Sequence, residues 1–82
     1  MNVIPNYLDG KIAGFKVTKL PKTGVASEVG LYEGDVIKEV NGVKLDSLSA
    51  VIGFYGRIYT EDRFEFLIER NSKLVRQVYI LK

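Results

Sequence analysis

The sequence contains no cysteine and no histidine among its 82 residues. Without cysteine, the chain forms no disulfide and offers neither a thiol nucleophile nor a thiolate metal site. Without histidine, it lacks the commonest general base and the commonest metal ligand. Its serines therefore have no histidine to activate them, and no motif pairs its carboxylates for catalysis. We expect no enzymatic activity, no cofactor and no metal site.

Long apolar runs and clustered charges are missing as well. No run approaches the roughly 20 apolar residues that span a bilayer, and residues 1–5 show neither the basic start nor the apolar core of a signal peptide. The 12 basic and 10 acidic residues are interspersed, with a net charge of +2. Binding to nucleic acid or to an anionic membrane surface usually needs a basic patch. We expect no nucleic-acid partner and no direct membrane insertion by this segment.

The residues that are present suit one small globular domain. Hydrophobic residues make up 46% of the chain and charged residues 27%, which is ordinary for a folded protein and unlike a disordered one. A chain of this length builds one core. We expect residues 1–82 to form a single domain of a longer protein, with any anchor or targeting segment outside it.

Alternating apolar and polar residues predict short strands. In residues 15–20, for example, Phe15 and Val17 alternate with polar side chains, which indicates one buried face. Asp-Gly, Asn-Gly and Asn-Ser dipeptides are typical of the tight turns that join neighbouring strands. The expected strands are residues 2–8, 15–20, 36–40, 44–45, 63–70 and 73–81.

Two helices are expected, a short one at residues 25–29 and a longer one at residues 48–59. Helical spacing gives the longer helix one apolar stripe that should face the core, formed by Leu48, Val51, Ile52, Tyr55 and Tyr59. A second apolar line flanks it at i+4 spacing, formed by Ala50, Phe54 and Ile58. The sum is an α+β domain: a small, partly open β-barrel or sandwich of five or six strands, capped by one short and one longer helix.

The stretch Ile12-Ala13-Gly14-Phe15 is a small apolar loop with one glycine, and it opens directly onto a strand. Backbone amides in such a loop can hold the carboxylate of a peptide, and the strand that follows can accept a peptide as a further strand. We interpret this stretch as part of a peptide-binding site. The alternative is that Gly14 only turns the chain.

Residues 30–42 resemble a PDZ domain of the bacterial type. They read Gly-Leu, two residues, Gly-Asp-Val-Ile, three residues and Asn-Gly. The flanking segments resemble other parts of the same family: its short helix at 25–29, its groove helix at 47–58 and its closing strands at 64–70 and 75–81. The resemblance covers nearly the whole chain and implies the PDZ-like version of the α+β fold.

Within that family, residues 9–17 and 64–70 look most like the C-terminal PDZ domain of the type II secretion inner-membrane component C. The resemblance implies a role in protein transport, as the periplasmic domain of a membrane-anchored parent protein that binds a secretion-machinery component or an exoprotein. The PDZ domains of bacterial periplasmic and membrane proteases share most of the same motifs. The alternative is therefore a substrate-recognition or regulatory domain of such a protease.

The family receives a peptide C-terminus or an internal strand between a strand and the groove helix. Carried onto this sequence, the carboxylate loop is 12–15, the receiving strand is 15–18, and the longer helix supplies the other wall. The implied site is Ile12, Ala13, Gly14, Phe15, Lys16, Val17, Thr18, Ala50, Phe54 and Ile58.

Two departures from the family pattern change the expected ligand. Ile12 stands where many members have glycine or an aromatic residue, and no histidine begins the helix. We therefore expect an apolar ligand or a non-terminal partner segment. If Phe54 lines an open groove and Ile52 belongs to the core, Phe54→Arg leaves the domain folded and Ile52→Asp unfolds it.

Overall fold

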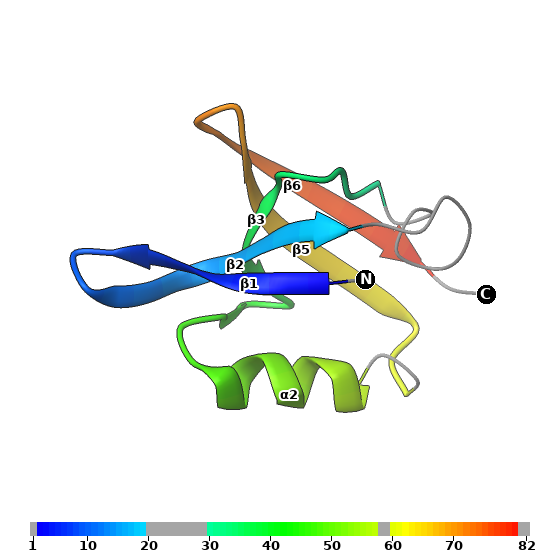
Figure 1. Ribbon diagram of the computed structural model, residues 1–82. Helices are drawn as coiled ribbons and strands as arrows, with labels where there is room; N and C mark the ends of the chain where they lie inside the picture. Colours follow the sequence, from blue (N-terminus) through cyan, green and yellow to red (C-terminus); the bar gives the residue numbers. More distant parts are fainter. Residues whose placement is uncertain (1, 20–29, 58–59, 81–82) are drawn as a thin grey trace.

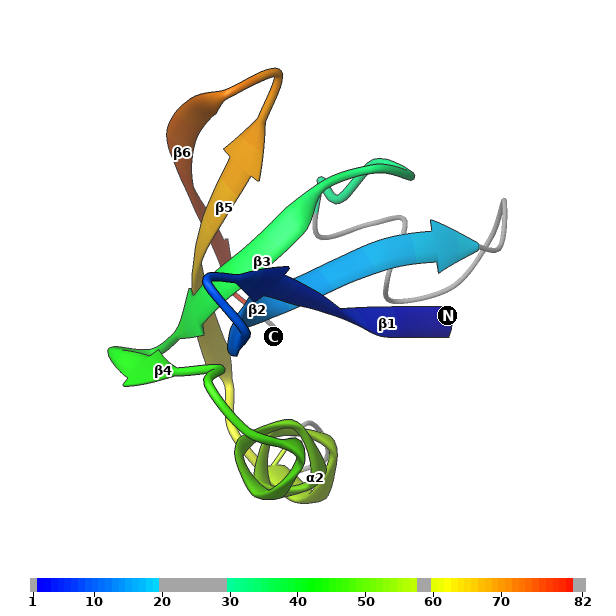
Figure 2. The same ribbon diagram turned by 60° about the vertical axis from the view of Figure 1, so that its left-hand side comes forward.

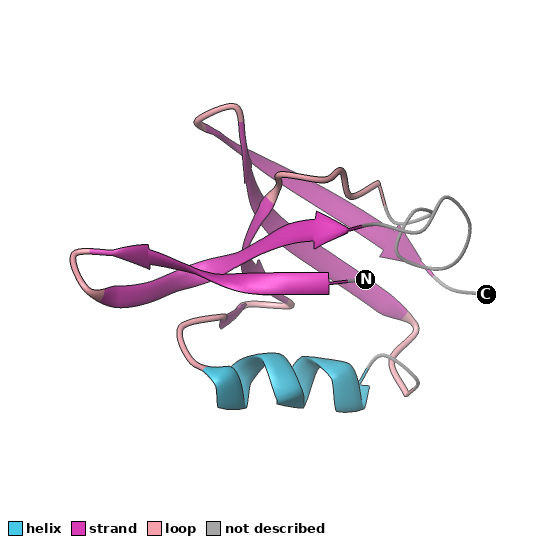
Figure 3. Ribbon diagram, viewed as in Figure 1, coloured by secondary structure: helices cyan, strands magenta, loops and turns pink. Residues whose placement is uncertain are grey.

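The computed structural model describes residues 2–19, 30–57 and 60–80, with the backbone alone for Asn2 and Tyr55. The expected short helix at 25–29 lies outside these residues. Figure 3 shows the strands and the helix that are described. They are β1 (Asn2–Leu8), β2 (Lys11–Lys19), β3 (Val36–Val40), β4 (Val43–Lys44), α2 (Leu48–Arg57), β5 (Arg63–Arg70) and β6 (Lys73–Ile80). No helix within the described ranges is long and apolar enough to cross a membrane.

The strands form one sheet in the order β1-β2-β3-β5-β6, with β4 paired to β3. Every pairing is antiparallel. The sheet does not close, so β1 and β6 are its two edges. Figure 2 shows that it bends strongly, with the β5–β6 hairpin standing across the direction of β1 and β2. The α+β fold with a partly open sheet is therefore confirmed.

The core lies inside the bend of the sheet, and α2 runs along its open side (Figure 1). Phe54 of α2 packs edge-to-face on Phe64 and Phe66 of β5, with ring centres 6.0 Å apart in each pair. The same cluster contains Phe15, Val17, Leu31, Ile37, Val40, Leu45, Val51 and Ile68.

The face of α2 that enters this core differs from the predicted stripe. Phe54 is only 5% exposed and Val51 is buried beside it, whereas Ile52 is 69% exposed and Leu48 is exposed one turn before it. The helix carries two adjacent apolar lines, and spacing alone does not decide which of them packs. The aromatic pair on β5 selects the line with Phe54. Of the remaining predicted stripe, the side chain of Tyr55 and all of Tyr59 lie outside what the structure describes.

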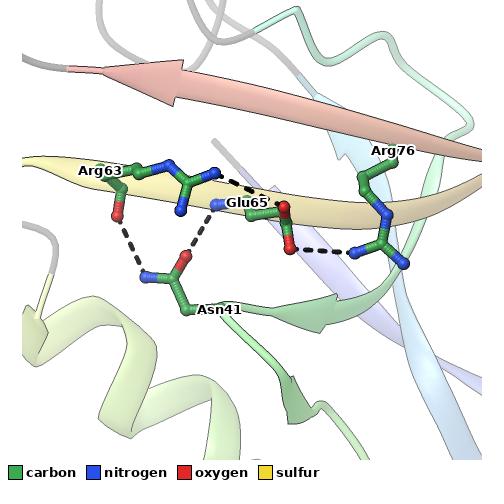
Figure 4. A network of polar contacts seen from close by, with 4 residues as sticks. All are labelled: Asn41, Arg63, Glu65 and Arg76. Atoms are coloured by element: carbon green, nitrogen blue, oxygen red, sulfur yellow. Dashed lines mark hydrogen bonds and ion pairs between the residues drawn. The ribbon is translucent and has the colours of Figure 1, made fainter.

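The Asn-Gly turn between β3 and β4 does more than reverse the chain. Asn41 has a positive φ of 50°, as a tight hairpin requires. Its side chain accepts a hydrogen bond from the Glu65 N–H (2.7 Å) and donates one to the Arg63 carbonyl (3.1 Å), as Figure 4 shows. Its own N–H donates to the Glu65 carbonyl (2.8 Å). Asn41 therefore fastens the hairpin to β5.

Substitutions of Asn41 separate its role in the turn, which needs a positive φ, from its side-chain bonds to β5. Asn41→Gly keeps the positive φ and loses the side-chain bonds, so we expect a loss of about 1–2 kcal/mol in the free energy of unfolding. Asn41→Ala also places an ordinary residue at positive φ, which adds roughly 1 kcal/mol. Urea denaturation measures both values. If Asn41→Gly is as stable as the wild type, the bonds to β5 contribute nothing.

Candidate functional site

The predicted receiving strand, residues 15–18 of β2, has a neighbour on each edge. On one edge it pairs with β1, where Phe15 lies opposite Pro5. On the other edge it pairs with β3, where Phe15 lies opposite Ile37. A partner strand could add at Phe15 only by displacing β1 or β3. β2 is therefore interior to the sheet at Phe15, and uptake of a partner by this strand stays a prediction.

Residues 12–14, predicted as a loop, belong to β2 (Lys11–Lys19), which pairs with β1, and one of their amides is already bonded. Gly14 donates its N–H to the Leu45 carbonyl (3.0 Å). The Ala13 carbonyl accepts bonds from Asn6 Nδ2 (3.1 Å) and Lys38 Nζ (3.3 Å). A Cβ at position 14 would lie 2.6 Å from the backbone oxygen of Ile37, and φ there is +88°. Gly14 therefore allows β2 and β3 to approach closely, which supports the alternative that it shapes the chain.

A pocket of about 250 Å³ lies beside this start of β2. Its walls include Ile12, Ala13 and Gly14 together with two lysines and two carboxylates, Lys38, Lys44, Glu39 and Asp46. The charges of opposite sign are equal in number, and Lys38 already bonds the Ala13 carbonyl. The pocket therefore does not favour an anion.

The predicted site residues do not come together on one surface. Phe15, Val17 and Phe54 belong to the core, Gly14 is buried, and Ile12, Ala13 and Ala50 are half-buried. Lys16 and Thr18 are exposed on β2. Ile58 lies outside the described residues. Phe54 is thus not the wall of an open groove, since its ring is enclosed by β5.

The sheet edge beside α2 belongs to β1, and the register shows which of its backbone groups face outward. Val17 donates to the Asp35 carbonyl (2.8 Å) and accepts from the Gly34 N–H (2.8 Å). Both groups of Val17 therefore point away from β1. Val3 lies opposite Val17, so the N–H and C=O of Val3 point to the outer edge. By the same alternation the carbonyl of Pro5 points outward, and proline has no N–H to offer.

Both elements that border this edge carry exposed apolar side chains. Ile4, Tyr7 and Leu8 are exposed on β1, and Leu48 and Ile52 are exposed on α2. Figure 1 shows α2 running below β1 along the open side of the sheet. Exposed large apolar residues on neighbouring elements are a feature of many interaction surfaces. Sequence reasoning counted Leu48 and Ile52 as core and did not select β1.

A buried ion pair fixes the segment that precedes β3. Arg70 of β5 donates from Nε to Asp35 Oδ1 (2.9 Å) and from Nη2 to Asp35 Oδ2 (2.7 Å). The same guanidinium donates to the Gly30 carbonyl (3.0 Å) and stacks on Tyr32, with Cζ 4.2 Å from the ring centre. The bond to Asp35 raises the pKa of Arg70, against the lowering effect of burial. The Gly-Asp signature thus has a structural partner that local sequence patterns do not reveal.

No protein-family model matches the sequence, and neither does any curated protein. Among solved structures, the PDZ domain of EpsC from Vibrio cholerae superposes over 96% of this chain with a TM-score of 0.73. The fold is that of a PDZ domain. This EpsC structure, of residues 204–305, is 19% identical in sequence, and 75% of it is covered. A second structure of the same PDZ domain, residues 219–305, gives a TM-score of 0.70 at 16% identity and covers 98% of this chain and 92% of that one.

Proposed function

We propose that this PDZ fold binds a protein or peptide, without catalysing a reaction, by taking it up as an added strand on the outer edge of β1. The observation that carries the proposal is the position of that edge. Within the described parts of the chain β1 has a neighbour only on its β2 side, and its other side lies above α2 (Figure 1). Strand addition at an exposed edge supplies affinity through main-chain hydrogen bonds.

The backbone of β1 offers a defined set of bonds to an antiparallel partner. Val3 presents both an N–H and a C=O, and Pro5 presents a C=O alone. Leu8 and Lys11 flank the two-residue turn at 9–10 and form a bonded pair, so Tyr7, opposite Ile12, points both its groups outward. A partner residue opposite Pro5 therefore donates a bond and finds no donor for its own carbonyl.

The side-chain preference comes from α2. Leu48 and Ile52 lie one helical turn apart and form an exposed apolar stripe next to the buried Val51. Such a stripe suits apolar side chains of the partner strand. The absence of histidine from the chain agrees with a ligand that needs no hydroxyl recognition at the start of the helix.

For the biological setting we propose a type II secretion system, in which the domain recruits a machinery component or an exoprotein in the periplasm. The resemblance of residues 9–17 and 64–70 to the inner-membrane component C supports this setting, and so does the likeness of the fold to the PDZ domain of EpsC. The alternative is a regulatory domain of a periplasmic or membrane protease. A protease domain encoded in the same parent chain would decide for the alternative.

The binding proposal can be tested with a library of random peptides displayed on phage. We expect the domain to enrich peptides rich in apolar residues. The selected peptide should slow hydrogen exchange at the amides of Val3 and Tyr7, and Ile52→Asp should weaken its binding tenfold or more. Leu74→Asp, the same change at an exposed position of β6, serves as the matched control and should leave affinity unchanged. No enrichment, or protection confined to other strands, would overturn the proposal.

A further inference from the structure

The second edge of the sheet, β6, is more regular than the first. It pairs with β5 over its whole length without a register shift, from Arg63 opposite Ile80 to Arg70 opposite Lys73. It contains no proline. By contrast, β1 contains Pro5 and two register shifts against β2, and prolines and bulges of this kind shorten the stretch over which an edge strand can pair without interruption. Within residues 73–80, β6 has neither a proline nor a register shift, and no described strand pairs with its outer side.

The turn between the two strands shows which groups of β6 face outward. Asn71 and Ser72 both have positive φ values, 54° and 64°, as a two-residue hairpin turn requires. Arg70 and Lys73 therefore form a hydrogen-bonded pair, and alternate positions along β6 point away from β5. The outward positions are Leu74, Arg76, Val78 and Ile80.

The residues whose N–H and C=O face away from β5 carry mostly apolar side chains, which a partner could bury. Leu74, Val78 and Ile80 are exposed large apolar residues. The one charge between them, Arg76, donates to Glu65 Oε2 at 2.9 Å (Figure 4). An unprotected edge with an apolar face is the kind of surface that takes up another strand.

We infer that β6 pairs with β6 of a second copy of this chain, antiparallel about a twofold axis at Gln77. In this register every outward position meets an outward position: Leu74 lies opposite Ile80 of the second copy, and Arg76 lies opposite Val78. Their N–H and C=O groups then form a continuous ladder, and the sheet runs through both copies. The surface is self-complementary, as a twofold interface must be.

The charges on β5 fit the same register. Glu65 is the neighbour of Val78 and Glu69 is the neighbour of Leu74. Residues that lie opposite one another on successive strands form a row across the sheet. Across the axis, the row through Glu65 and Val78 continues to Arg76 of the second copy. The row through Glu69 and Leu74 continues to Ile80 and Arg63 of the second copy. Each row thus places an acid of one copy and a base of the other two or three strands apart, at about 4.8 Å per strand, with apolar side chains between them. This complementarity favours a second copy over an unrelated strand as the occupant.

The test is sedimentation equilibrium of the chain over a range of concentrations. We expect the apparent mass to rise toward twice that of the monomer. Val78→Pro removes an N–H that faces away from β5, so it leaves the β5–β6 ladder intact and should raise the dissociation constant about tenfold or more, since the change occurs twice in the dimer. Val78→Lys keeps the backbone N–H of residue 78 but places a charge at the interface, so it should also raise the dissociation constant of the dimer.

The matched control is Ile52→Lys, which places the same charge on the exposed face of α2 and should leave the dissociation constant unchanged. A wild-type chain that stays monomeric at concentrations on the order of 1 mM would overturn the inference, and so would a dimer that Ile52→Lys dissociates but Val78→Lys does not. Because β1 is not involved, the peptide-binding proposal stands or falls separately.

Discussion

Replacing Arg70 by glutamine is expected to lower the free energy of unfolding by about 3–5 kcal/mol. The change removes the bidentate partner of Asp35, whose side chain is only 2% exposed. Among the described residues the carboxylate then keeps the bond from the Tyr32 N–H (2.9 Å), and a buried charge without its counter-ion is strongly destabilising. The substitution also releases the carbonyl of Gly30. Urea denaturation followed by circular dichroism measures the loss.

Arg76→Gln is the matched control, because it removes the same group from another arginine–carboxylate pair in the same hairpin. Arg76 and Glu65 are 59% and 30% exposed, compared with 22% for Arg70. An exposed pair contributes roughly 0–1 kcal/mol. We therefore expect Arg76→Gln to stay within about 1 kcal/mol of the wild type. Equal losses in the two variants would show that burial does not govern the Asp35 pair.

Most of the described strands and the helix α2 were predictable because their signals are local, whereas residues 12–14, predicted as a loop, belong to β2. The Asn-Gly turn at 41–42 and the alternation within β5 are each contained in a few neighbouring residues. Ser47 precedes α2, and its Oγ accepts the Ala50 N–H (3.2 Å), as an N-cap serine does. The PDZ resemblance then supplied the arrangement of these elements, which the superposition on EpsC confirms.

The interior position of β2 was not predictable in this way, because an edge is a property of the whole sheet. The alternation in β2 reveals one buried face, but it says nothing about which strands lie to either side. In β1 the alternation of apolar and polar residues is weaker and Pro5 interrupts it, so its sequence gives a weaker signal for a strand. Its position at the edge follows only from the order β1-β2-β3-β5-β6. Proline is tolerated in an edge strand because it has no N–H, whereas an interior strand needs the N–H of every residue for its ladder.

The ion pair between Asp35 and Arg70 escaped prediction for a related reason. The two residues are 35 positions apart, and they meet because β3 and β5 are neighbours in the sheet. Each residue has an ordinary local explanation, Asp35 in a turn and Arg70 at a strand end. Only the pairing of the strands shows that the guanidinium also holds Gly30 and Tyr32.

Phe54→Arg is expected to unfold the domain, which reverses the outcome predicted from the sequence. Truncating a buried phenylalanine costs about 3–5 kcal/mol, and here the replacement also places a guanidinium against Phe64 and Phe66. Burial of an unpaired charge adds several kcal/mol. A domain of this size has a total stability of about 5–10 kcal/mol, so little folded protein should remain. Loss of the circular-dichroism transition on heating would record the effect.

Ile52→Asp, two residues away on the same helix, is expected to leave the domain folded. Its side chain is 69% exposed, and surface substitutions of this kind usually change stability by less than about 0.5 kcal/mol. Comparing the stabilities of the two variants therefore tests which face of α2 packs against the core. If Ile52→Asp unfolds the domain while Phe54→Arg does not, the helix is rotated from the position described. If the orientation is right, the loss of peptide binding proposed for Ile52→Asp reflects the surface of α2, because the core beneath it remains intact.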